Sequence, residues 1–160
     1  MRDFFAAKRW TAWLWISAVV IVLDQITKQA IEKHFAFGES LTITSFFNLV
    51  LAYNRGAAFS FLHDAGGWQK WFFICISVAA SAMILYLLRK HASEKWFCFA
   101  LAFILGGALG NLIDRILYGH VIDFIQVHGA GYYFPAFNLA DSAITLGAIL
   151  LILQSFKKPA

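Results

Sequence analysis

The sequence predicts an all-α membrane protein with four transmembrane helices, a small extracytoplasmic β element and an interfacial amphipathic helix. The 160-residue chain is 61% hydrophobic and only 14% charged, with a mean hydropathy of +0.68. A soluble domain is instead about half apolar and a quarter charged. Four apolar segments also approach or reach the roughly 20 residues that a bilayer-spanning helix needs. The length predicts one integral-membrane domain, residues 1–160.

Each predicted span is a run of apolar residues. The runs cover about 11–30, 68–88, 96–117 and 138–156. The second and third have long charge-free cores, whereas the first and fourth carry charges only near one end. We disfavour a cleaved signal sequence for the first run, because no convincing small-x-small cleavage motif follows it.

The segments between the spans have different patterns. The stretch "SLTITSFFNLVLAY" alternates as β-strands do and predicts a few short strands before the second span. The stretch "NRGAAFSFLHDAGGW" follows it and is typical of an amphipathic segment lying in the membrane interface. We expect a loop over 118–137, between the third and fourth spans.

The distribution of basic residues predicts the orientation of the chain. Four spans place both termini on one side, together with the short turn at 89–95. That side holds eight Lys and Arg and two acids, whereas the other side holds five Lys and Arg and seven acids. By the positive-inside rule, both termini are therefore cytoplasmic and the 32–67 and 118–137 regions face outward.

Under this topology the unusual polar residues gather at one depth, near the outer membrane–water boundary. Asp24 and Lys28 are four residues apart with the acid first, a favourable order for an ion pair on a helix. Further candidates lie at the outer end of the third span, at the start of the fourth, and after the predicted strands: Asn111, Asp114 and Arg115; Asn138 and Asp141; Asn54, Arg55 and Gly56. Most of them have a simple structural explanation as ion pairs, helix ties or helix caps.

Asp123 and Asp141 fit a purely structural explanation less well. A carboxylate at membrane depth costs at least about 2.5 kcal/mol, which favours a functional role. No Lys, Arg or His lies in "VIDFI" or "FNLADSAITL" to neutralise either one. Two such carboxylates brought together would share one proton, as in an aspartic protease. The helix dipole favours Asp141 as the ionised member, and an apolar setting favours the proton on Asp123.

Other chemistries lack their sequence signals. The serines have no GxSxG setting, and neither Cys75 nor Cys98 has a nearby histidine. The five histidines show no metal-binding spacing, so we expect neither a metal nor an organic cofactor. His120 and His128 flank Asp123, and they either shift its pKa or are simply solvated.

Four blocks in order along the chain resemble bacterial lipoprotein signal peptidase, or signal peptidase II: "VLDQITK", "AYNRGAAFSFL", "GGALGNLIDRILYGHVIDF" and "FNLADSAITLG". The resemblance implies a multi-pass aspartic endopeptidase of the bacterial inner membrane with its active site toward the periplasmic face. It implies removal of signal peptides from prolipoproteins just before a diacylglyceryl-modified cysteine, in the course of lipoprotein maturation.

The resemblance also implies roles for particular residues. The catalytic pair falls on Asp123 and Asp141, and the supporting polar residues fall on Asp24, Lys28, Asn54, Asn111, Asp114, Arg115 and Asn138. The implied partners are diacylglyceryl prolipoproteins, membrane lipid and globomycin-type inhibitors, with no nucleic acid. Arg55 stands where many members carry a smaller residue, and its role is open.

Two other classes of function stay open from the residues. A small proton- or ion-coupled transporter would use buried acids as a relay, but would distribute its charges through the bilayer depth. A non-catalytic membrane scaffold would use the same acids only to hold its helices together.

Overall fold

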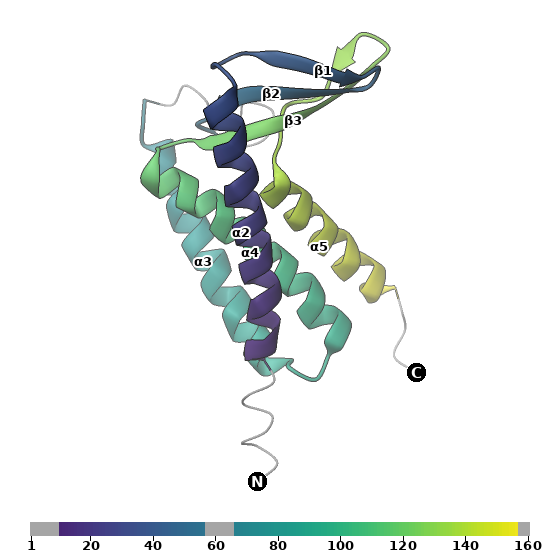
Figure 1. The fold of residues 1–160 in the computed structure, drawn as a ribbon. Helices are drawn as coiled ribbons and strands as arrows, with labels where there is room; N and C mark the ends of the chain where they lie inside the picture. Colours follow the sequence, from purple (N-terminus) through teal and green to yellow (C-terminus); the bar gives the residue numbers. More distant parts are fainter. Residues whose placement is uncertain (1–9, 57–65, 157–160) are drawn as a thin grey trace.

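The computed structural model describes residues 10–56 and 66–156, which form four long helices and a small sheet (Figure 1). The helices are α2 (Thr11–His34), α3 (Gln69–Lys90), α4 (Lys95–Leu117) and α5 (Leu139–Ser155). The sheet lies across one end of the helices. The start of α2, the turn from α3 to α4 and the end of α5 lie at the opposite end.

Helix α4 is the centre of the bundle, because it packs against α2, α3 and α5. Small residues allow these close contacts. A Cβ atom on Gly106 would lie 2.7 Å from the Cβ of Val20, and one on Gly147 would lie 2.6 Å from the carbonyl oxygen of Ala100. The "GGALG" stretch of α4 (residues 106–110) therefore contributes to close helix packing.

Three of the predicted spans are confirmed as helices that are long and apolar enough to cross a membrane, namely α2, α3 and α4. Helix α5 is apolar but has only 17 residues. Helix α2 continues four residues beyond the predicted boundary at residue 30, because the polar "IEKH" that follows is compatible with a helix and places Lys33 and His34 at its negative end.

The sheet is antiparallel, with strands in the order β1 (Ser40–Thr44), β2 (Phe47–Asn54), β3 (Val121–Gly129) and β4 (Tyr132–Tyr133). The predicted strands before the second span are confirmed as β1 and β2. The prediction of a loop over 118–137 was wrong, since β3 and β4 lie within it. Strand β3 contains β-branched residues and completes its hydrogen bonds on β2, a partner about 70 residues away.

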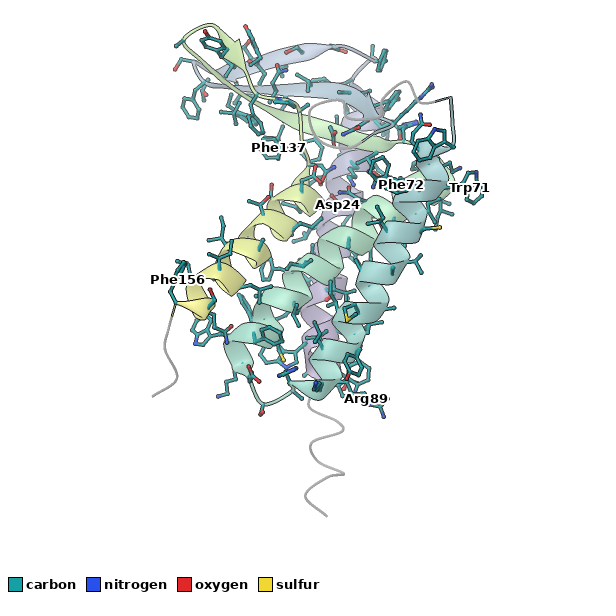
Figure 2. All side chains as sticks on the ribbon, turned by 180° about the vertical axis from the view of Figure 1, so that it is seen from behind. Asp24, Trp71, Phe72, Arg89, Phe137 and Phe156 are labelled. Carbon is teal, nitrogen blue, oxygen red and sulfur yellow. The ribbon has the colours of Figure 1, made fainter. Side chains whose placement is uncertain are left out.

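Aromatic and charged side chains mark the two ends of the helices. Trp71 and Phe72 lie near the sheet, whereas Arg89 lies at the opposite end of α3 (Figure 2). Asp24 lies at the level where the helices meet the sheet. The predicted interfacial amphipathic helix falls mostly on residues 57–65, which lie outside the described residues.

Candidate active site

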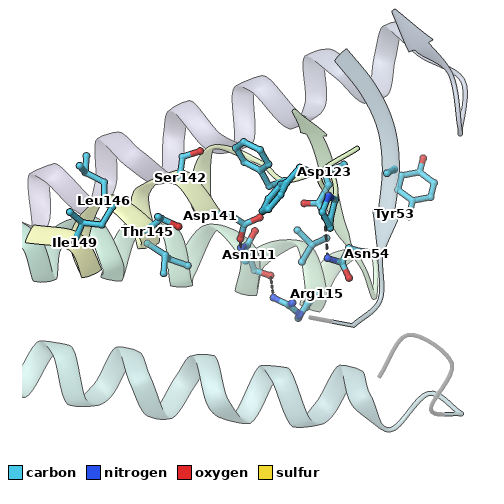
Figure 3. A pocket seen from close by; sticks show the side chains of 17 residues that line it. Tyr53, Asn54, Asn111, Arg115, Asp123, Asp141, Ser142, Thr145, Leu146 and Ile149 are labelled. Carbon is cyan, nitrogen blue, oxygen red and sulfur yellow. Dashed lines mark hydrogen bonds between the residues drawn. The ribbon is translucent and has the colours of Figure 1, made fainter. Parts of the chain in front are cut away.

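A groove of about 850 Å³ lies where the sheet meets the helices (Figure 3). Strands β2 and β3, helices α4 and α5 and the segment between β4 and α5 all contribute to its wall. Its polar side chains lie beside the sheet, and apolar side chains continue along α5: Asn54, Asn111, Arg115, Asp123 and Asp141, then Ile144, Leu146 and Ile149. The groove is therefore polar at one end and apolar along its length.

Asp123 is held in the groove by strand β3, opposite Ala52 of β2. Its side chain is 2% exposed. Oδ1 accepts a hydrogen bond from Nδ2 of Asn138 at 2.7 Å, and Oδ2 accepts one from Nδ2 of Asn54 at 3.1 Å. Burial, followed by the charge of Asp141, raises the pKa of Asp123 to about 7, although the two amide donors lower it. Asp123 thus retains a proton to near neutral pH.

Asp141 is positioned by the first turn of α5. Asn138 is the N-cap: its Oδ1 accepts from the backbone N–H of Asp141 at 2.9 Å, and its own backbone N–H donates to Oδ2 of Asp141 at 3.3 Å. Oδ1 of Asp141 accepts from Nδ2 of Asn111 at 2.8 Å. The half-buried Asp141 therefore faces the groove from a helix end whose dipole favours negative charge.

Two asparagines connect the carboxylates. Nδ2 of Asn138 donates to Asp123 and also, at 3.2 Å, to Oδ1 of Asn111, whose own Nδ2 donates to Asp141. Both asparagines are buried. The chain of contacts runs from Asp123 to Asp141 entirely through neutral amides, which orient the carboxylates without forming an ion pair with them.

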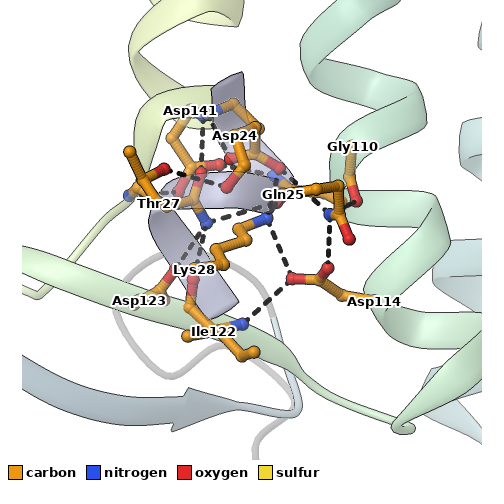
Figure 4. Close-up of polar contacts among 12 residues, drawn as sticks. Asp24, Gln25, Thr27, Lys28, Gly110, Asp114, Ile122, Asp123 and Asp141 are labelled. Atoms are coloured by element: carbon orange, nitrogen blue, oxygen red, sulfur yellow. Dashed lines mark hydrogen bonds and ion pairs between the residues drawn. The ribbon is translucent and has the colours of Figure 1, made fainter. Parts of the chain in front are cut away.

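A cluster of buried charges, formed by Asp24, Lys28 and Asp114, contacts Asn111 of the groove wall through Lys28 (Figure 4). Nζ of Lys28 is 2.8 Å from Oδ2 of Asp24 and 2.9 Å from Oδ2 of Asp114, and all three side chains are at most 1% exposed. The predicted Asp24–Lys28 ion pair is therefore confirmed. This pair lies within α2 and is buried, not exposed at a helix end, and Lys28 also joins α2 to α4 through Asp114.

Arg115 holds the end of β2 in place. Its guanidinium donates to the carbonyl oxygens of Asn111 and Gly56 at 3.3 and 3.2 Å, and its Cζ lies 5.1 Å from the ring centre of Phe73. Oδ1 of Asn54 accepts from the N–H of Gly56 at 3.0 Å. This turn fixes Asn54, one of the two amide donors to Asp123.

Arg55 does not line the groove. It is exposed and lines a second cavity of about 490 Å³, together with Lys70 and His120.

The two histidines that flank Asp123 have partners of their own. The ring of His120 packs on that of Tyr53, with 4.1 Å between the ring centres. Nε2 of His128 lies 3.2 Å from Oδ1 of Asn48. Within residues 10–56 and 66–156, no group of three or more His, Cys, Asp or Glu could hold a metal ion.

Sequence reasoning missed Gln25 and two glycines. Nε2 of Gln25 donates to Oδ1 of Asp114 at 2.8 Å, and its three-residue spacing from Lys28 was the available signal. A Cβ on Gly110 would lie 2.6 Å from Oδ2 of Asp24, and one on Gly107 would collide with the carbonyl oxygen of Ala140. These glycines therefore make room for the site as well as for helix packing.

Taken together, the fold and the groove define a helical membrane-type protein with a two-carboxylate site at one end of its helices. The model of the family described as signal peptidase (SPase) II matches residues 16–157. The chain is 61% identical over 146 residues to the lipoprotein signal peptidase of Ralstonia nicotianae, which covers 91% of this chain and 84% of that protein. It is 55% identical over 157 residues to that of Janthinobacterium sp. (strain Marseille), covering 98% and 95%.

Solved structures agree with the sequence relatives. A bacterial membrane enzyme determined by the in meso method at 2.3 Å resolution superimposes with a TM-score of 0.82 at 34% identity, covering 94% of each chain. The chain belongs to the signal peptidase II family. It is thus a peptidase and a bacterial membrane protein, and membership excludes the transporter that the sequence had left open.

Proposed function

We propose that this chain is an aspartic endopeptidase that cuts prolipoproteins just before the diacylglyceryl-modified cysteine, with Asp123 and Asp141 as its catalytic pair. The observation that carries the proposal is the convergence of both carboxylates on one groove. Each is held by an asparagine amide, and neither forms an ion pair with another residue of 10–56 or 66–156. Relatives named lipoprotein signal peptidase, at 55–61% identity, support the substrate class. Cleavage of a lipidated model prolipoprotein by the purified protein tests it.

The pair would act by general acid–base catalysis with one shared proton. Asp141, as carboxylate, takes a proton from a water molecule whose oxygen attacks the scissile carbonyl carbon. Asp123, as acid, gives its proton to the carbonyl oxygen. When the C–N bond breaks, the leaving amine takes the proton from Asp141, and the hydroxyl proton returns to Asp123. No cofactor takes part in these steps.

The pKa of Asp123 leads to a prediction for the pH dependence of turnover. Asp123 must be protonated to act as the acid, and it loses its proton as the pH rises through about 7. We therefore expect kcat/KM to fall as the pH rises above about 7, because this parameter reports groups of the free enzyme. Carboxyl-carbon NMR of the labelled aspartates should find the proton on Asp123. A proton found on Asp141 would reverse the two roles.

The shape of the groove supports a lipid-anchored substrate. The wall along α5 is apolar and includes Ile144, Leu146 and Ile149, whereas the carboxylates lie at the end beside the sheet. In our proposal the acyl chains stay in the lipid or along this wall while the peptide bond reaches the pair. Globomycin-type inhibitors would occupy the same groove and compete with the substrate.

We further propose that α5 is the fourth span, with both termini cytoplasmic and the groove at the periplasmic face of the inner membrane. The mean hydropathy of the chain and the apolar character of α5 support a fourth span. In our proposal this span is short because α5 begins directly beneath the sheet. The excess of Lys and Arg at the helix ends remote from the sheet supports the orientation.

Reporter fusions test this orientation. A reporter fused after Lys158 is expected to report the cytoplasm, because that end carries the positive excess. One inserted at Gly66, near the sheet end of α3, is expected to report the periplasm. The reverse pattern would contradict the charge-based topology and place the groove on the cytoplasmic face.

A further inference from the structure

The N-terminus of α5 is held from α2 as well as by its own cap. Oδ1 of Asp24 accepts a hydrogen bond from the backbone N–H of Ala140 at 2.9 Å. Ala140 directly precedes Asp141, so this contact fixes the backbone beside one member of the carboxylate pair. Asp24 is completely buried, and the absence of a side chain at Gly110 leaves room for its carboxylate.

Strand β3 is held in the corresponding way from α4. Oδ2 of Asp114 accepts a hydrogen bond from the backbone N–H of Ile122 at 3.2 Å. Ile122 directly precedes Asp123, the other member of the pair. Two buried carboxylates on different helices therefore each fix the main chain one residue before a carboxylate of the groove.

Lys28 joins these two contacts. Its Nζ lies 2.8 Å from Oδ2 of Asp24, 2.9 Å from Oδ2 of Asp114 and 2.9 Å from Oδ1 of Asn111 (Figure 4). An ammonium group has three N–H donors, and these three acceptors can use all of them. Because Asn111 itself donates to Asp141, one cation contacts three of the groups that hold the pair in place.

We propose that Lys28 is a positioning residue for the peptidase reaction, an inference that rests on the proposed function of the pair. It holds β3 and α5 at the separation that brings the two carboxylates together. Its positive charge also stabilises the ionised pair. If the buried ions served only to stabilise the fold, Lys28 would neither position the two carboxylates nor stabilise their ionised form.

The charges around Asp123 give the second effect a measurable sign. Asp141 from α5 disfavours its ionisation, whereas Lys28 from α2 favours it. From α4, Arg115 also interacts with both groove carboxylates. Asp24 and Asp114 are the remaining charges in the buried cluster.

Each deprotonation of the pair creates negative charge, so removing Lys28 should make both deprotonations harder. Both limbs of the pH–rate profile should then move to higher pH.

The test uses full-length protein in detergent and a lipidated prolipoprotein peptide. We expect Lys28→Met to lower kcat by about 100-fold with little change in KM, as a misplaced reacting group does. Its pH–rate profile should shift upward by about half a unit or more. Gln25→Met removes a neutral donor to Asp114, so it should lower kcat less and leave the profile in place. Lys70→Met, outside the cluster, should match the wild type.

A double variant covers the case in which Lys28→Met does not fold. Asp24→Asn/Lys28→Met removes one charge of each sign, so the net charge of the cluster is kept, but the bridge is lost. It should retain the low kcat with a smaller pH shift. Wild-type kcat and an unmoved profile in either variant, even with a lower Tm, would overturn the positioning role. If Asp123→Asn stayed active, the proposed pair itself would fail, whatever the Lys28 variants did.

Discussion

Conversion of either Asp123 or Asp141 to asparagine is expected to lower kcat/KM at least about a thousandfold, because general acid–base catalysis contributes about 10²–10⁴ and neither role survives alone. Asparagine keeps the size of the side chain and can still accept from the amides of Asn138 and Asn111. The variants should therefore fold as the wild type does, which thermal unfolding in detergent checks.

A pair that acts as a unit also predicts non-additive losses. The double variant Asp123→Asn/Asp141→Asn should be little worse than either single variant. Glu39→Gln is the matched control, an exposed carboxylate on the sheet side outside the groove, and it should stay within about twofold of wild type. A single variant that kept a tenth of wild-type turnover would rule out the aspartic mechanism.

The lipid on the substrate should matter nearly as much as the pair. A peptide with a diacylglyceryl cysteine is expected to be cut at least about 100-fold faster, in kcat/KM, than the same peptide with a free thiol. Each buried CH₂ contributes about 0.8 kcal/mol of anchoring free energy. Every tenfold difference in kcat/KM corresponds to about 1.4 kcal/mol, and the many CH₂ groups of two acyl chains supply more than that. In our proposal they hold the cysteine at the depth of the groove, beside the apolar wall of α5.

The comparison needs both peptides in the same detergent micelles, with product masses read directly. A singly acylated cysteine is the informative intermediate and should fall between the two rates. Equal rates on all three peptides would contradict a lipid-dependent substrate. Cleavage at a bond other than the one before the cysteine would remove the prolipoprotein assignment.

Much of the helical fold could be predicted because each span is encoded locally. The runs of apolar residues place the long helices to within a few residues, and the first boundary was missed only where polar helix-forming residues continue α2 to His34. Strand β3 was missed because its stability depends on pairing with β2, and the residues of β3 alone do not indicate so distant a partner. The interfacial helix stays a prediction, since 57–65 lie outside the described residues.

The residues of the candidate site could be predicted where a charged residue stands within an apolar stretch of sequence. Asp123 and Asp141 were found in this way, and so were Asp24 and Lys28. Their contacts were not predictable, because the backbone N–H of Ala140 donates to Asp24 across a large separation in the sequence, and the backbone N–H of Ile122 donates to Asp114 only through the path that the chain takes from α4 to β3. Gln25 was missed because it carries no charge and so does not stand out in the sequence. Arg55 does carry a charge and was named as a candidate, but it lies outside the groove.

The most direct test of the catalytic pair is one cleavage reaction with purified protein and a lipidated model prolipoprotein, run with the wild type and with Asp141→Asn. Mass spectrometry of the released peptide is the measurement. The proposed pair predicts that the wild type releases a single signal peptide ending at the residue before the lipidated cysteine, and that Asp141→Asn releases none. Release of the same peptide by Asp141→Asn at a comparable rate would contradict it.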